Sequence, residues 1–160
     1  MISIVESSTY EHHRTSLGRF ENTPIAVGSQ SPYNIKVEKK RSSGEWKELE
    51  DFPFASYGIY GYSMVTFDNA LYLFGGSGDG KQLNLAAKYN GKWSKVGALL
   101  TPRYLHRSIA AGNTIIHLGG YEPAWVNTFF SSLFATFILD NLSSGHLMVT
   151  ILWQVNLKQR

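Results

Sequence analysis

Short apolar runs separated by turn residues make up most of the chain. The runs Val65–Phe67 and Ala70–Phe74 flank the dipeptide Asp68-Asn69, and a further pair of runs flanks Asn90-Gly91. Asn, Asp and Gly accept the positive φ that a two-residue hairpin turn requires. Residues 10–120 show no sustained helical period. The pattern therefore predicts a succession of β-hairpins.

The same pattern recurs along the chain. Residues 62–76 align without gaps on residues 106–120, and a weaker copy lies at residues 15–29. Trp46 and Trp93 repeat independently, each after a turn-like tract. A period of about 45 residues is typical of repeat arrays and propellers. Each unit is expected to be a four-stranded antiparallel meander.

A fixed order of motif residues marks these units. It consists of a double glycine closing an apolar strand, then a tyrosine, a tryptophan and an arginine preceded by proline. The motif positions are Gly28, Trp46, Gly75, Gly76, Tyr89, Trp93, Gly119 and Gly120. With Pro102-Arg103 ahead of His106, this order resembles the kelch repeat, although the first unit departs from it at Ser29. The resemblance implies a β-propeller of four-stranded blades that acts chiefly in protein binding.

The repeat divides the chain unevenly. Residues 1–12 are expected to be the tail of a preceding blade, 13–56 and 57–105 two kelch-like repeats, 106–121 the first half of a third, and 122–160 a degenerate or non-homologous segment. Closing a propeller takes about four to eight blades. We therefore expect an all-β, incomplete propeller with an irregular C-terminal segment, as in a fragment, an incomplete gene model or a truncated paralogue.

The C-terminal segment leaves alternatives open. Residues 124–139 carry no charge, but a membrane helix needs about 20 apolar residues, and this stretch is interrupted by Asn127, Ser131 and Ser132. A membrane span is therefore not expected. The alternatives are that the segment forms the two outer strands of the third blade with a degraded pattern, or that it is a tail unrelated to the repeat. Residues 146–153 are a candidate for one more strand.

Composition narrows the class of protein. Hydrophobic residues make up 43% of the chain against 17% charged, so a packed core is expected. The net charge of +3 is too small to indicate nucleic-acid binding, and the basic run Lys39-Lys40-Arg41 is expected to be a solvated hairpin tip. The chain has no cysteine, which excludes disulfides and thiolate metal sites. With no visible signal peptide, a cytoplasmic location is expected.

Candidate chemistry is sparse. His12 and His13 are adjacent and would point to opposite faces of a strand, while His106 and His117 lie on expected partner strands without a third ligand. The glycine-rich tract at residues 75–80 lacks the Lys-Ser/Thr of a phosphate loop. The sequence therefore predicts no catalytic residue, cofactor or metal, and no enzyme. The alternatives are a fragment of a propeller oxidase, isomerase or hydrolase, or a non-functional truncated product.

The meander topology predicts where a partner binds. Short turns should lie at one end of the blades and the long loops, residues 51–61, 77–82 and 97–105, at the other. Long loops on a rigid scaffold commonly carry binding residues, and aromatic and arginine side chains dominate binding hot spots. The candidates for binding a protein partner are Tyr57, Tyr60, Arg103 and Tyr104.

Each of these candidates also has a structural interpretation. Kelch repeats often carry an arginine at the position of Arg103, and the structural alternative for Tyr57 and Tyr60 is packing beneath the loop. The leading hypothesis is a protein-protein interaction module with an adaptor or scaffold role and an unidentified protein partner. Open blade edges would favour self-association.

Overall fold

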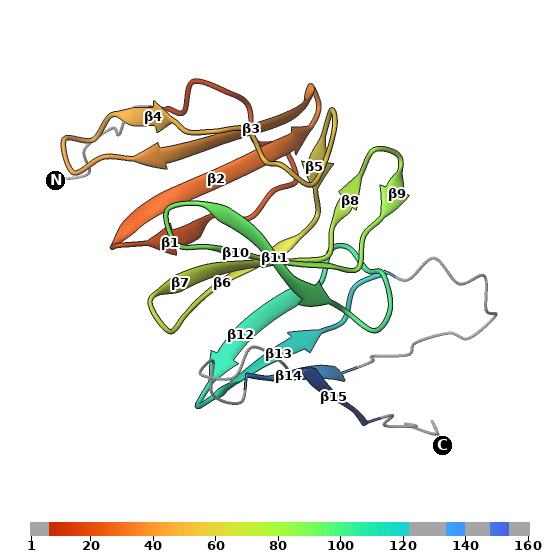
Figure 1. Cartoon of the computed structure of the whole chain (residues 1–160). Helices are drawn as coiled ribbons and strands as arrows, with labels where there is room; N and C mark the ends of the chain where they lie inside the picture. The colour runs from red at the N-terminus through yellow and green to blue at the C-terminus, as the bar shows by residue number, and fades with distance from the viewer. Residues whose placement is uncertain (1–6, 122–133, 140–147, 154–160) are drawn as a thin grey trace, which may run out of the picture.

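The structure, a computed structural model, describes residues 7–121, 134–139 and 148–153. These residues form three four-stranded antiparallel sheets and one three-stranded sheet, with no helix among them (Figure 1). The sequence-based prediction of an all-β chain of four-stranded antiparallel blades is therefore confirmed.

The first sheet is a meander of β1 to β4 in chain order. Its strands are β1 (Gly18–Phe20), β2 (Thr23–Gln30), β3 (Tyr33–Lys40) and β4 (Trp46–Glu48). Glu21 and Asn22 have φ values of 49° and 61° in the β1–β2 turn. Two successive positive φ angles match the right-handed twist of a hairpin, so the turn fixes the register of the meander.

The second sheet has the order β11-β10-β7-β6. Its strands are β6 (Ser63–Phe67), β7 (Ala70–Phe74), β10 (Leu85–Tyr89) and β11 (Trp93–Ala98). Every residue of β7 is buried, because a neighbouring sheet covers each of its faces. A small sheet pairs β5 (Ile59–Tyr60) with β8 (Ser77–Gly78), and β8 with β9 (Lys81–Gln82).

The third sheet follows the order β12-β13-β14-β15. It contains β12 (Arg107–Ala111), β13 (Thr114–Leu118), β14 (Phe134–Leu139) and β15 (Met148–Trp153). The two outer strands come from the segment that the sequence left open between a third blade and an unrelated tail. The rest of residues 122–160, and residues 1–6 of the expected preceding blade, lie outside the described residues.

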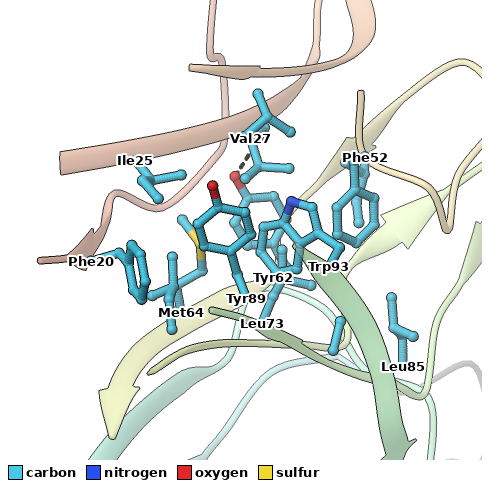
Figure 2. Packing of buried hydrophobic residues seen from close by; sticks show 14 residues of the cluster. Phe20, Ile25, Val27, Phe52, Tyr62, Met64, Leu73, Leu85, Tyr89 and Trp93 are labelled. Carbon is cyan, nitrogen blue, oxygen red and sulfur yellow. Dashed lines mark hydrogen bonds between the residues drawn. The ribbon is translucent and has the colours of Figure 1, made fainter. Parts of the chain in front are cut away.

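The interface between the first two sheets is the larger core (Figure 2). Trp93 is 8% exposed, and its ring lies edge-on to Phe52 at a centroid distance of 5.1 Å. Tyr89 meets Phe20 in the same geometry, also at 5.1 Å. Edge-to-face pairs of this kind add about 0.5–1.5 kcal/mol to the burial of each ring. The motif aromatics of the second blade therefore pack against the first.

One polar group in this core is fully satisfied. Tyr62 is 1% exposed, and its hydroxyl donates a hydrogen bond to the backbone carbonyl of Val27 across the interface (Figure 2). Burial raises the pKa of this phenol, so the hydroxyl keeps its proton and acts as a donor. The bond joins the residue that precedes β6 of one blade to β2 of its neighbour.

The interface between the second and third sheets is smaller. Its buried apolar residues are Ala70, Tyr72, Phe74, Ala86, Leu99 and Ile115. His106 and His117 are both fully buried here, and the ring centroids of Phe74 and His117 lie 4.5 Å apart. This interface therefore combines a short apolar stripe with two imidazoles.

Glycine is required where the chain enters the next blade. Gly75 has φ +60°, and a Cβ atom there would overlap the backbone carbonyl oxygen of Arg103; Gly28, also at φ +60°, stands in the same relation to Ile59. Gly119 has φ +66° but no neighbouring atom within 4 Å among the described residues. Gly28 and Gly75 are thus needed for the close backbone approach at two blade junctions.

A chain of backbone hydrogen bonds links the blades where each first strand is about to begin. The N–H of Gly61 donates to the carbonyl of Arg14 at 2.7 Å, and the N–H of Leu105 donates to that of Gly61 at 2.6 Å. All three residues have positive φ, between 57° and 64°. Successive blades therefore meet through the same backbone conformation, whichever residue occupies the position.

Candidate functional site

The long connections lie at the end of the blades opposite the short hairpin turns. The β8–β9 hairpin and the β11–β12 loop are far from the β6–β7 and β12–β13 turns (Figure 1). The β5–β8 pairing attaches the connection between the first two blades to the second blade. This end of the molecule is called the loop face below.

Tyrosines from several connections gather on the loop face. Tyr57 is 51% exposed and Tyr33, the first residue of β3, is 54% exposed. The Tyr33 ring lies 5.6 Å from that of Tyr57 and 6.1 Å from that of Tyr60. The Tyr33 ring thus contacts both other rings, and such a group offers a large apolar area at little cost in side-chain entropy, as rigid aromatic contact residues do in binding surfaces.

A second pair of tyrosines comes from the third blade. Tyr104 and Tyr121 form a backbone bridge, with N···O distances of 3.2 and 2.9 Å, and their rings are 5.6 Å apart. Tyr121 is 65% exposed, whereas Tyr104 is partly buried. Tyr60 and Tyr104 occupy equivalent positions in successive repeats, so the repeat itself places one tyrosine per junction here.

A depression of about 410 Å³ lies between Tyr60 and Tyr104. Its lining residues come from the N-terminal connection, the end of β2, β5, the β8–β9 hairpin and the β11–β12 loop: Arg14, Gln30, Tyr60, Ser77, Gly80, Lys81, Gln82 and Tyr104. Two of these side chains are cationic and none is a carboxylate. The depression is therefore polar and positively charged, and the side-chain amides of Gln30 and Gln82 line its wall.

The loop that carries Tyr57 is held by a carboxylate. Asp79 accepts hydrogen bonds from the backbone N–H groups of Ser56, at 2.8 and 2.9 Å, and of Tyr57, at 3.1 Å. Desolvation raises the pKa of Asp79, but the hydrogen bonds from Tyr57 and Ser56 outweigh it and hold the pKa below its usual value. The charged form is thus the one that orders the loop.

Arg103, predicted as a binding candidate, lies beneath the loop face and is only 2% exposed. Its guanidinium donates to the Gly119 carbonyl at 3.1 Å and to the Thr101 hydroxyl at 3.1 Å. Its own carbonyl accepts a hydrogen bond from Gly76 at 2.8 Å. These contacts correspond to the structural alternative for Arg103, a link between the second blade and the third.

The other motif residues occupy three settings. Tyr89 and Trp93 lie in the first interface, and the glycine doublets lie at the blade junctions, with Gly76 and Gly120 at φ +99° and +94°. Trp46 is partly buried at the outer side of the first sheet, where the Lys40 ammonium lies over its ring at 5.5 Å. Trp46 and Trp93 thus share a repeat position but not an environment.

Sequence reasoning missed Tyr33 and Tyr121. Tyr33 follows a connection of only two residues, Ser31 and Pro32. The prediction considered only the long loops and therefore did not include it. Tyr121 follows the third glycine doublet directly. Their positions just after the second strand of a repeat would have identified both, because that strand ends at the loop face.

Metal ions and membrane helices find no support within the described residues. No group of three or more His, Asp or Glu side chains there is arranged to hold a metal ion. No helix that is long and apolar enough to cross a membrane occurs in that part of the chain either.

Comparison with known proteins supports the repeat assignment. No protein-family model matches the sequence. The chain is 32% identical over 93 residues to Kelch-like protein 40 of Xenopus tropicalis, covering 55% of this chain and 15% of that protein. It is 30% identical over 107 residues to human Kelch-like protein 30, covering 62% and 17%, and 31% identical over 123 residues to Kelch-like protein 40 of Xenopus laevis, covering 70% and 20%. The chain therefore spans a fifth or less of these relatives.

The fold agrees with that comparison. The solved structure of YjhT, a kelch-type propeller, superposes with a TM-score of 0.71 at 16% identity, over 91% of this chain and 47% of YjhT. The likeness to YjhT shows the fold alone, since the identity is low. Together with the Kelch-like relatives, it confirms the resemblance to kelch repeats and the partial propeller.

Proposed function

We propose that this chain, a set of kelch-type propeller blades, is a protein-interaction module that binds its partner on the loop face. The observation that carries the proposal is the cluster of two exposed tyrosines, Tyr33 and Tyr57, with the partly buried Tyr60, beside the depression that Tyr60 shares with Tyr104. Aromatic side chains on a rigid support are the residues that binding surfaces favour. The similarity to Kelch-like proteins supports a protein as the partner.

The arrangement also favours binding over a purely structural role for these tyrosines. Tyr33 and Tyr57 each leave about half of their surface in water although they touch each other. A ring that served only to pack beneath the loop would bury most of its area. An adaptor or scaffold role, in which the blades join this partner to another protein, is the finer part of the proposal.

Site-specific photo-crosslinking tests the face directly. A photoreactive phenylalanine analogue is placed at Tyr57, at Tyr104 and, as a matched control, at Val96, which is 44% exposed on the outer strand β11. The expected result is a common crosslinked protein at Tyr57 and Tyr104 that is lost when Tyr33 and Tyr60 are changed to Ala. Crosslinks at Val96 alone, or capture unaffected by the alanine changes, would contradict the proposal.

A further inference from the structure

The three four-stranded sheets follow one another in an arc, and each end of the arc presents one face of a sheet (Figure 1). The first open face is the side of the first sheet that points away from the second, and it carries Leu17 and Pro24. The last open face is the side of the third sheet that points away from the second, and it carries Ile109, Ile116 and Leu118. Repeats of an array contact their neighbours, so an end face is where a further blade stacks.

The first open face leaves exposed a position that the repeat buries inside the arc. Gly18 and Ile25 face the second sheet, so the neighbouring Leu17 and Pro24 point to the opposite side. Leu17 is 67% exposed, whereas Met64, at the same repeat position, is 9% exposed in the first interface. Covering Leu17 would therefore reproduce at this end what the next repeat already has.

A buried carboxylate on the same side of the first sheet does not prevent this covering. Val37 lies in the first interface, so Glu38 points to the opposite side. Glu38 accepts hydrogen bonds from the backbone N–H groups of Thr9 and Tyr10, both at 3.0 Å, and lies 2.9 Å from the Nε2 atom of His12. Its charge is thus satisfied within the chain before another blade approaches.

The last open face carries branched apolar side chains. Ile115 and His117 pack toward the second sheet, so Ile116 and Leu118 of the same strand point away from it, and both are only partly buried. Ile109 is paired with Ile116 across β12 and β13, lies on the same face and is 49% exposed. This end of the arc therefore also presents apolar surface to water.

The repeat specifies which of these residues meet when the arc is continued. At the first interface, a Cβ atom at Gly18 would lie 3.1 Å from the sulfur of Met64. Ile109 has the repeat position of Gly18, and Leu17 has that of Met64. A further junction of the same kind brings Ile109 of one blade against Leu17 of the next, and buries both.

The sizes of the side chains are complementary at this junction. A Cβ atom at Gly18 would lie 2.6 Å from the Leu71 side chain, so a glycine is required opposite that leucine. The first blade has Pro24 at the position of Leu71. The compact proline ring leaves room for the larger Ile109 side chain, as close packing requires.

We propose that two copies of this chain close one propeller ring, in which the first open face of each copy packs against the last open face of the other. The arc has the curvature of a propeller, since 91% of the chain superposes on YjhT with a TM-score of 0.71, and it covers 47% of YjhT. Two arcs account for 2 × 47 = 94% of such a ring. A two-fold axis makes the two junctions identical, and a head-to-tail contact with this curvature closes instead of extending into a filament. The inference does not depend on the proposed binding face.

Sedimentation equilibrium of the full chain measures the assembly. The expected mass is 2 × 17.9 = 35.8 kDa, without larger species as the concentration rises. Leu17→Lys and Ile109→Lys should each weaken the dimer at least about 100-fold, because every dimer then buries two ammonium groups in apolar junctions. Val96→Lys, at a residue that is 44% exposed on β11, is the matched control and should leave the mass unchanged. Circular dichroism checks that each variant is folded.

Disulfide trapping identifies the faces that meet. The chain has no cysteine, so Leu17→Cys and Ile109→Cys each give a chain with a single thiol. Mild oxidation of their mixture with diamide should give a reducible covalent dimer that contains one of each, because a disulfide needs Cα atoms within about 7 Å. Neither variant alone should crosslink, and neither should the mixture of Leu17→Cys with Val96→Cys.

Three results would overturn the proposal. A monomer at every concentration would leave the open faces to blades of another chain. Oligomers that grow with concentration would show that the arc does not close. A dimer without the crosslink between Leu17→Cys and Ile109→Cys would place the contact elsewhere. None of these results affects the photo-crosslinking test of the loop face.

Discussion

The two blade interfaces are built at equivalent positions of the repeat but from different side chains. Where Tyr62 donates to a backbone carbonyl of the first blade, His106 occupies the matching place in the next interface. The first interface holds Trp93 and Tyr89 against Phe52 and Phe20, while the second has a short apolar stripe and a buried imidazole pair. The repeat therefore fixes where blades meet, and the side chains decide how strongly and under which conditions they stay together.

The largest expected effect is at the first interface. Trp93→Ala removes a ring that is 92% buried against Phe52 and should lower the free energy of unfolding by about 3–5 kcal/mol. Urea denaturation followed by circular dichroism measures the change. A loss below about 1 kcal/mol would show that this ring does not hold the first two blades together.

Acidification should act on the second interface next most strongly. The folded pKa values of His106 and His117, about 4 and 3, lie below the value of 6.5 for free histidine. The unfolded chain then binds more protons between pH 6.5 and 4, so stability falls as the pH falls through this window. The loss is up to about 1.4 kcal/mol per pH unit for each ring.

Urea midpoints at pH 7 and pH 5 measure this loss. Glu38 contributes little to the stability change between pH 7 and 5. Desolvation raises its pKa, but hydrogen bonds from His12, Tyr10 and Thr9 outweigh it and lower the pKa in the folded state, so its stabilisation is lost only below the usual glutamate pKa of 4.5. The variant His106→Phe combined with His117→Asn should show a smaller decrease between the two pH values. An equal decrease in this variant would assign the acid sensitivity to other groups.

The first glycines of the two doublets differ in how closely another part of the chain approaches them. Gly75→Ala introduces a Cβ that overlaps the Arg103 carbonyl at a positive φ, and should cost about 2–3 kcal/mol. Gly119→Ala meets the same unfavourable φ without a neighbouring atom within 4 Å and should cost about 1 kcal/mol. Thermal melting of both variants measures the difference, and equal costs would mean that backbone approach at Gly75 is unimportant.

The smallest effect is expected at Trp46, the repeat counterpart of Trp93. Its ring is partly buried and contacts Lys40 at 5.5 Å, so Trp46→Ala should cost about 1 kcal/mol or less. The same denaturation experiment applies. A cost equal to that of Trp93→Ala would show that a tryptophan at this repeat position stabilises the chain wherever it lies.

The sequence predicted the features that local chemistry determines. Asp68-Asn69 adopts the expected pair of positive φ angles, 46° and 54°, and the two glycine doublets directly follow β7 and β13. These outcomes depend on residues adjacent in the chain, and their conformational preferences are visible in the sequence.

Features made by distant residues could not be predicted. The β5–β8 pair joins Ile59 to Gly78 through strands of two residues, too short to show any periodicity. The burial of Arg103 depends on the position of the Gly119 carbonyl sixteen residues later. The assembly of Tyr33, Tyr57 and Tyr60 likewise requires the fold to bring the start of β3 beside the connection that follows β4, and the role of these tyrosines stays a prediction.

The backbone hydrogen bonds that run from Arg14 to Gly61 to Leu105 set the spacing between blades without any side chain. An arginine, a glycine and a leucine occupy these three equivalent repeat positions with nearly the same φ. A substitution at one of these positions should consequently leave the blade-to-blade geometry unchanged, as long as the new residue tolerates a left-handed conformation. The neighbouring loop residues can thus change in sequence while the spacing between blades is preserved.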